Sequence, residues 1–211
     1  MDRAVTSLGF ARADAVAQPA APVSTPETDP DAGVVRRALG DAEPQIRPAP
    51  VAFGDPGPWY VTLGAGSAVD FTDAVDTLGF ARFSTFLGKD LEFGFEVGGW
   101  FIAQEGPDTG GASLVFDTRY HFWHSRDALW TAFGEAGIGV IWTGRQVPVG
   151  GTDVNFLPRA GAGMTYLLDG QGTRLTFGLR WHHISNARIN GDDRNPSRNG
   201  LMGYVGVQLP L

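Results

Sequence analysis

The sequence contains no cysteine, which excludes a disulfide framework, a cysteine nucleophile and a zinc site built on thiolates. It has no apolar run of about 18 residues, so a membrane-spanning helix is not expected. Charged residues make up only 18% of the chain, and the net charge of −7 argues against a nucleic-acid-binding protein, which needs a basic surface. What is abundant is glycine (30 residues) and aromatic side chains, among them 14 Phe and 6 Trp. This composition is typical of a β-rich chain.

The composition changes near residue 58. Residues 1–58 hold nine of the fourteen prolines and none of the tryptophans. So few apolar side chains cannot offset the entropy cost of ordering, which predicts a mostly disordered extension with a short helix around 31–42. Residues 1–17 end in the small-residue sequence AVA, which is similar to a signal-peptide cleavage site, but the preceding apolar stretch is short and interrupted by charge. We interpret this segment as the remnant of a signal peptide, in a sequence whose start is truncated or misassigned.

From Trp59 onward, apolar and polar residues alternate and turn residues recur at regular intervals. The pattern predicts eight strands, at 59–66, 76–88, 91–104, 112–124, 130–143, 153–168, 173–186 and 200–210. Closing them into a ring removes the free sheet edges. With no spanning helix, a β-barrel is the remaining way to cross a membrane. Residues 59–211 therefore predict an all-β fold, an eight-stranded antiparallel up-and-down transmembrane β-barrel.

The alternation also predicts which face meets lipid. In 91–97, large apolar residues alternate with Glu92, Glu96 and glycine, and the later strands repeat this arrangement. The polar faces carry charges of both signs, which can pair inside a narrow lumen: Glu92, Glu96, Asp117, Arg119, Glu135, Arg159 and Arg180. The alternative is a soluble lipocalin-like barrel with the faces inverted, which would crowd Phe and Trp into the lumen. We therefore favour the membrane barrel.

Tryptophans near strand ends predict an aromatic girdle at the membrane surface. Trp130, Trp142 and Trp181 lie on the apolar faces of their strands. Trp100 joins them only if Gly98 and Gly99 form a bulge that shifts the alternation.

Three polar residues interrupt the apolar outer face near one end of the last two strands. Continuing the alternation of Leu179 and Trp181 places His183 and Ser185 on the outer face, and the alternation of the last strand places Asn199 there too. Polar groups facing hydrocarbon are costly unless paired. One interpretation is a serine nucleophile, a histidine base and an orienting carbonyl, acting on a lipid. The other is that they are ordinary strand-end residues in the wet interfacial zone.

The same residues carry a family resemblance. The sequence HISNA at 183–187, followed by DRNP at 193–196, resembles the PagL-type lipid A 3-O-deacylases, the acyloxyacyl hydrolase family of outer-membrane barrels. The resemblance implies an enzyme of the Gram-negative outer membrane that hydrolyses the ester at position 3 of lipid A and releases a 3-hydroxy fatty acid. It implies that Ser185 is the nucleophile and His183 the general base, that Asn195 contributes to the oxyanion hole, and that a backbone amide near Arg188 is the second donor.

The chain departs from the family pattern at Ser197, where the family has a glycine, and at two further positions. Asn199 stands where the family has an acid, and Arg188 where it has a glycine. An asparagine can orient a histidine but supplies no charge to stabilise imidazolium, and Asp192 or Asp193 could substitute if the loop folds back. A non-catalytic structural or adhesive barrel is therefore the alternative function.

The expected partners are lipid A or lipopolysaccharide, membrane lipids and a second copy of the chain, but not nucleic acid, and no cofactor or metal is expected.

Overall fold

The computed structural model describes the chain in three stretches, residues 52–70, 75–191 and 195–211. The predicted signal-peptide remnant, the short helix and most of the predicted disordered extension lie outside these residues, as do Asp192 and Asp193. Within the described residues, no helix is long and apolar enough to cross a membrane.

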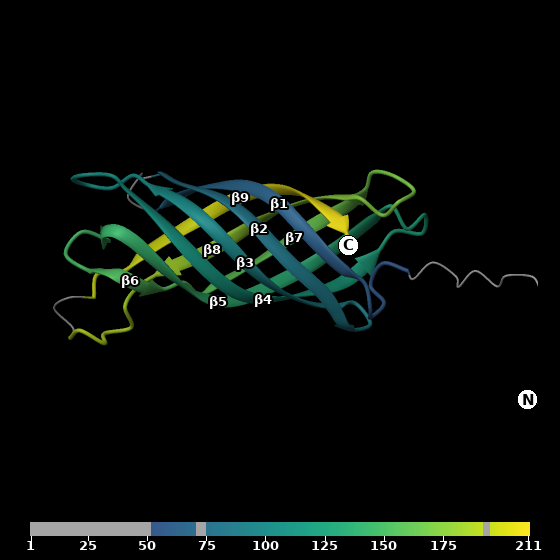
Figure 1. Ribbon diagram of the computed structural model, residues 1–211, viewed down its shortest axis with the longest axis horizontal. Coiled ribbons are helices and arrows are strands. Elements are labelled where there is room, and N and C mark those ends of the chain that lie inside the picture. The colour runs from purple at the N-terminus through teal and green to yellow at the C-terminus, as the bar shows by residue number, and fades with distance from the viewer. Residues whose placement is uncertain (1–51, 71–74, 192–194) are drawn as a thin grey trace, which may run out of the picture. The chain divides into compact units, whose positions relative to one another are not determined.

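Nine antiparallel strands form the described structure (Figure 1). They are β1 (Trp59–Asp70), β2 (Val75–Gly88), β3 (Leu91–Ile102), β4 (Thr109–His124), β5 (Trp130–Val147), β6 (Thr152–Phe156), β7 (Arg159–Leu167), β8 (Arg174–Ile184) and β9 (Arg198–Pro210). Each strand pairs with the next one in the chain, except β6 with β7, and the pairing of β1 with β9 closes the ring. Because β6 and β7 both pair with β5, the nine strands occupy eight positions of a barrel. The predicted eight-stranded antiparallel barrel is confirmed.

The sixth barrel strand is broken, whereas the sequence predicted one continuous strand over 153–168. The interruption falls at Leu157 and Pro158. Proline has no N–H to donate to a strand ladder and is disfavoured inside a sheet. The side chain of Leu157 is buried and its amide donates to the carbonyl of Gly139 (2.8 Å). Residues 156–158, at the break, pair with the end of β8 and the residue after it. The polar outer residues His183 and Ser185 lie at that end of β8.

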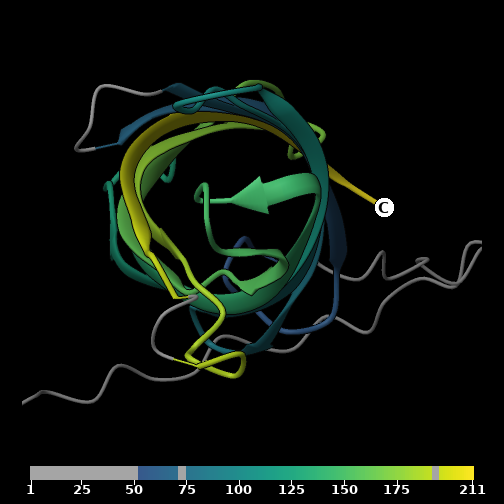
Figure 2. The ribbon, with the colours of Figure 1, turned by 90° about the vertical axis from the view of Figure 1, so that its left-hand side faces the viewer.

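Strands also run further than predicted at the barrel end with the longer connections. Strand β1 continues to Asp70, β4 begins at Thr109 and β5 continues to Val147. These extensions contain glycine and polar residues without clear alternation, so the sequence pattern did not identify them as strands. They still form strands because the hydrogen bonds between strands need only backbone groups. Seen along the barrel axis, the end of β5 and its connection to β6 bend inward across this mouth (Figure 2).

The lumen is filled by charged side chains of both signs, as predicted. Four arginines and four acids are almost completely buried there: Arg82, Arg119, Arg159, Arg180, Glu92, Glu96, Asp117 and Glu135. Each arginine pairs with at least one acid, for example Arg82 with Glu92 (2.8 Å) and Arg180 with Glu135 (2.8 Å). Burial of such charges is tolerated only when they are paired. The soluble alternative, which needs an apolar lumen, is therefore wrong.

The outer wall is apolar. Many large side chains there are at least half exposed, including Leu63, Phe101, Phe116, Ile138, Leu179 and Val205. Trp142 and Trp181 face outward as predicted. Trp100 does not, because neither ladder of β3 has a bulge at Gly98 or Gly99. It points into the lumen instead, and its indole N–H donates to the hydroxyl of Ser113 (2.8 Å).

The opposite, tight-turn end of the barrel is filled by residues just before β1. The ring of Phe53 lies edge-on to Phe86, with the centroids 5.1 Å apart, and the Arg174 guanidinium lies 4.2 Å from its centroid. Contacts with the barrel therefore begin before Trp59, within the stretch that composition alone assigned to the extension.

Candidate active site

The candidate site lies where β8 ends and β9 begins, at the barrel end with the long connections. The inward residues of this part of β8, Arg180 and His182, are buried in the lumen. Since successive strand residues point to opposite faces, Trp181 and His183 lie on the outer face. Strand β9 pairs antiparallel with β8 in a register that sets Asn199 directly opposite His183. The predicted outward parity of His183 and Asn199 is thus confirmed.

Three of the predicted site residues form one hydrogen-bonded chain. His183 Nε2 lies 2.9 Å from Ser185 Oγ, and His183 Nδ1 lies 2.9 Å from Asn199 Oδ1. An amide oxygen can only accept, so this contact requires a proton on Nδ1 and leaves the Nε2 lone pair to accept the serine proton. Nucleophile, base and orienting group stand in the order that activates a weak hydroxyl.

The backbone around Ser185 is held by the broken sixth strand. Ser185 and Phe156 exchange two hydrogen bonds, from Phe156 N to Ser185 O (2.8 Å) and from Ser185 N to Phe156 O (3.3 Å). The amide of His183 donates to the carbonyl of Pro158 (3.0 Å). Ser185 is 7% exposed, while His183 and Asn199 are half-buried. The nucleophile candidate therefore sits on fixed backbone although it follows the last residue of β8.

The predicted oxyanion-hole residues lie in the segment after Ser185. Asn195 Oδ1 accepts a hydrogen bond from the amide of Asn186 (3.2 Å), so Asn195 is tied to the residue that follows the serine. This contact engages its oxygen, and its Nδ2 is the end that can donate. The second donor was expected to be a backbone amide near Arg188. The amide of Arg188 itself donates to Asn186 Oδ1 (2.9 Å). The structure therefore joins Asn195 to the site and engages the Arg188 amide elsewhere.

Backbone conformation explains the glycine of the family pattern. Ala187 and Arg188 have φ angles of 53° and 65°, in the left-handed region that glycine adopts without cost. A residue with a Cβ pays roughly 1–2 kcal/mol there. The departure at Arg188 is thus accommodated in the backbone shape that the glycine would adopt.

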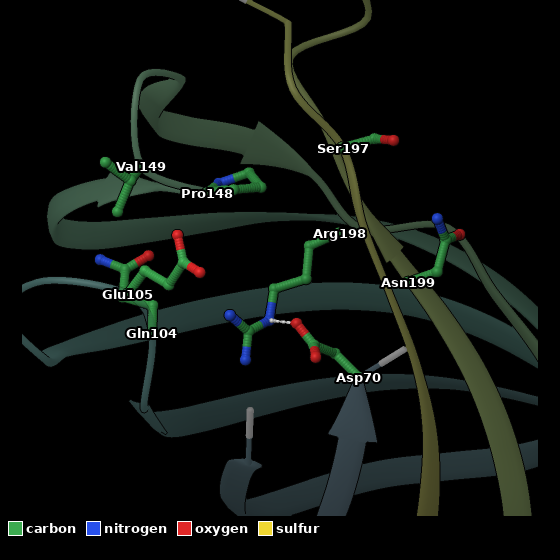
Figure 3. A pocket seen from close by; sticks show the side chains of 8 residues that line it. All are labelled: Asp70, Gln104, Glu105, Pro148, Val149, Ser197, Arg198 and Asn199. Atoms are coloured by element: carbon green, nitrogen blue, oxygen red, sulfur yellow. Dashed lines mark ion pairs between the residues drawn. The ribbon is translucent and has the colours of Figure 1, made fainter. Parts of the chain in front are cut away.

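On the lumen side, the start of β9 is anchored at the barrel mouth. Arg198 and Asn199 point to opposite sides of the strand (Figure 3). The Arg198 guanidinium pairs with Asp70 (3.3 Å) and with Asp76 (2.7 Å), and His182 Nε2 lies 3.4 Å from Asp76. Of these residues, Asp70 and Arg198 border a cavity of about 330 Å³. The cavity lies at the barrel mouth, and Ser197 and Asn199 also line it.

Next to the anchor, the backbone of β9 approaches β8 closely. A Cβ atom on Gly200 would lie only 2.7 Å from His182 Cε1. The absence of a side chain at Gly200 therefore leaves room for the His182 ring beside the Arg198 pairs.

One contact of the site was missed by sequence reasoning. The indole N–H of Trp181 donates to Asn199 Oδ1 (3.2 Å), and the Trp181 ring stacks on the His183 ring with centroids 6.0 Å apart and planes inclined by 29°. The available signal was the position of Trp181, two residues before His183 on the same face. Sequence reasoning assigned it only to the girdle.

Comparison with known proteins identifies a family and similar barrel folds. A family model described as lipid A 3-O-deacylase (PagL) matches residues 75–208, which include Ser185, His183 and Asn199. Among solved structures, the chain is similar to the outer membrane enzyme PagL, at 19% identity and a TM-score of 0.54, over 71% of this chain and 99% of that one. It is also similar to Neisserial surface protein A, at 16% identity and a TM-score of 0.55, over 72% and 96%. No curated protein matches the chain.

Proposed function

The chain belongs to the lipid A 3-O-deacylase (PagL) family, and on that premise we propose that it is an outer-membrane esterase that removes the 3-O-linked hydroxyacyl chain of lipid A. The observation that carries the proposal is the hydrogen-bonded chain from Ser185 through His183 to Asn199. It lies on the apolar outer wall of the barrel, where the accessible substrates are lipids. The outer membrane of a Gram-negative bacterium is where such a barrel meets lipid A.

In the proposed reaction, Ser185 Oγ attacks the ester carbonyl carbon while its proton passes to His183 Nε2. The tetrahedral intermediate collapses by breaking the bond to the sugar oxygen, which takes the proton from His183. Water then attacks the acyl-enzyme with His183 again as base, releasing the 3-hydroxy fatty acid and restoring Ser185. Asn199 holds the imidazole with Nδ1 protonated throughout, so that Nε2 is the atom that exchanges the proton.

The oxyanion is assigned to the segment after the nucleophile. Asn195 is the candidate side-chain donor, because the Asn186 amide engages its oxygen and leaves its NH₂ group to donate. One such donor, aimed at the developing negative charge, is worth about 2.7–4 kcal/mol in the barrier. The Arg188 amide could serve as the second donor only after releasing Asn186 Oδ1.

A lipid substrate is also supported by the wall beside the site. An apolar groove of about 410 Å³ runs over β7, β8 and β9, lined among others by Met164, Phe177 and Leu179. Leu179 lies four residues before His183 on the same strand face, about 13 Å away along an extended strand. An acyl chain lying against this groove would bury apolar surface while its ester reaches Ser185.

The proposal is tested with the full chain purified in detergent micelles and incubated with lipid A, with mass spectrometry of the product. The Ser185→Ala variant removes the nucleophile, and Ser67→Ala is its matched control, because Ser67 is an exposed residue of β1. We expect loss of one 3-hydroxyacyl chain with the parent and with Ser67→Ala, but not with Ser185→Ala.

A second outcome has its own support in the sequence. Asn199 lacks the charge of the family's acid, which favours a non-catalytic structural or adhesive barrel. Intact lipid A with all three proteins, each shown to be folded by its heat-dependent gel mobility, would overturn the proposed hydrolysis and favour the non-catalytic barrel. Hydrolysis that persists in Ser185→Ala would remove Ser185 from the mechanism.

A further inference from the structure

The orienting group of this site has an ambiguity that a carboxylate lacks. The two ends of the Asn199 amide differ, since one accepts hydrogen bonds and the other donates them. With Oδ1 toward His183, the imidazole carries its proton on Nδ1 and can act as base through Nε2. With the amide turned over, its NH₂ group would donate to Nδ1, and the proton would sit on Nε2. In that tautomer His183 cannot accept the proton of Ser185.

Trp181 supplies a group that distinguishes the two orientations. Its indole N–H can only donate, and it points to Asn199 Oδ1 at 3.2 Å. Turning the amide over would replace this hydrogen bond by two opposed donors. Trp181 and Asn199 are diagonal neighbours across the β8–β9 ladder, since Asn199 is opposite His183 and Trp181 is opposite Leu201. Such diagonal pairs are within reach of an aromatic side chain.

Packing and solvent exposure also favour the orientation in which Asn199 Oδ1 faces His183 and Trp181. The Trp181 ring stacks on the His183 ring, so the same side chain restricts the imidazole plane. It lies on the apolar outer wall and is 39% exposed. There an unpaired indole N–H is costly, and its partner in the structure is Asn199 Oδ1.

We propose that Trp181 is a positioning residue that fixes the Asn199 amide, and through it the tautomer of His183, in this asparagine-containing site. The inference rests on the proposed function for its kinetic consequence, but its structural content, the tautomer of His183, does not depend on any substrate. It assigns Trp181 a role beyond that of an interfacial tryptophan.

The kinetic test is a double-substitution cycle in detergent micelles with lipid A. Trp181→Phe keeps an aromatic ring and removes the N–H, and we expect kcat to fall about fivefold with KM little changed, the loss of one orienting hydrogen bond. In the Asn199→Asp background either carboxylate oxygen can accept, so Trp181→Phe should change kcat by less than about twofold. Trp142→Phe is the matched control, because Trp142 is an outward tryptophan on β5, away from the β8–β9 pair.

The second readout needs no activity. Nitrogen NMR of ring-labelled histidine, at a pH where the imidazole is neutral, reports which nitrogen carries the proton, and the His183→Gln variant assigns the signal. We expect protonated Nδ1 in the parent, a shift toward protonated Nε2 in Trp181→Phe, and protonated Nδ1 again in Trp181→Phe with Asn199→Asp.

The outcomes separate this inference from the proposed function. An unchanged tautomer in Trp181→Phe overturns the inference, and so does an equal fall in kcat in both backgrounds. If neither the parent nor Asn199→Asp hydrolyses lipid A, the proposed function fails, and the tautomer measurement still decides whether Trp181 fixes the amide.

Discussion

Replacing Asn199 by Asp should make the site faster, because it supplies the charge that this chain lacks. The substitution keeps the size and shape of the side chain, so the 2.9 Å contact with His183 Nδ1 and the donation from Trp181 are retained. In the proposed mechanism, what changes is the transition state, in which His183 becomes positively charged. A neutral hydrogen bond contributes about 1 kcal/mol and one to a charged group about 1.5–3 kcal/mol. The difference of roughly 0.5–2 kcal/mol predicts a kcat higher by about 2- to 30-fold.

The cost of the new charge should be small at this position. Asn199 is half-buried and is the second residue of β9, at the mouth of the barrel. Charges on a barrel's outer face cost about 0–1 kcal/mol near the membrane surface, and carboxylates less than lysine or arginine. We therefore expect Asn199→Asp to fold as the parent does, with a similar midpoint of unfolding in urea.

The assay measures the initial rate of 3-hydroxy fatty acid release from lipid A in mixed micelles, with Ser185→Ala as the baseline. Asn199→Leu, which is similar in size but accepts no hydrogen bond, should lower kcat below that of the parent. If folded Asn199→Asp is no faster than the parent, a carboxylate at this position does not stabilise the charge on His183, and the assignment of position 199 as the orienting group is refuted.

Two further predictions concern the oxyanion segment and the lumen. Asn195→Ala should lower kcat by about 10²–10³-fold with KM little changed, since the proposed role of the Asn195 NH₂ group is to donate to the transition state. A kinetic comparison with the parent checks this prediction. An unchanged kcat would remove Asn195 from the oxyanion hole. Arg159→Met leaves Glu96 and Asp117 each short of one partner, and should lower the free energy of unfolding in urea by about 3 kcal/mol. The exposed Arg145→Met is its control, and equal stability of the two variants would contradict a paired lumen.

Much of the fold was predictable because the membrane imposes a simple rule. A narrow barrel in lipid must place large apolar residues outside and small or paired polar residues inside, so the alternation at Glu92 and Phe93 identifies both faces at once. The pairing of charges was predictable as a class. The individual partners were not, because Arg159 and Glu96 are 63 residues apart and meet only across the closed lumen.

The candidate site was predicted to the extent that strand parity determines it. The spacing of His183 and Ser185, and the parity that reaches Asn199, placed all three on one face, and the structure joins them by hydrogen bonds. Parity does not give the register of β8 against β9, on which the Trp181 contact depends. Nor does it reveal that a backbone amide such as that of Arg188 is already engaged.

A catalytic group on the outside of a barrel must be held without the walls of a cleft. Strand β8 shows how the two faces share this task, because Arg180 and His182 are fixed in the lumen while Trp181 and His183 alternate with them outside. On β9, Arg198 is anchored inside by Asp70 and Asp76, and its neighbour Asn199 faces His183 outside. A strand residue cannot shift without moving its neighbours to the other face. The packed, ion-paired lumen therefore fixes the register that brings His183 and Asn199 together on a surface that faces lipid.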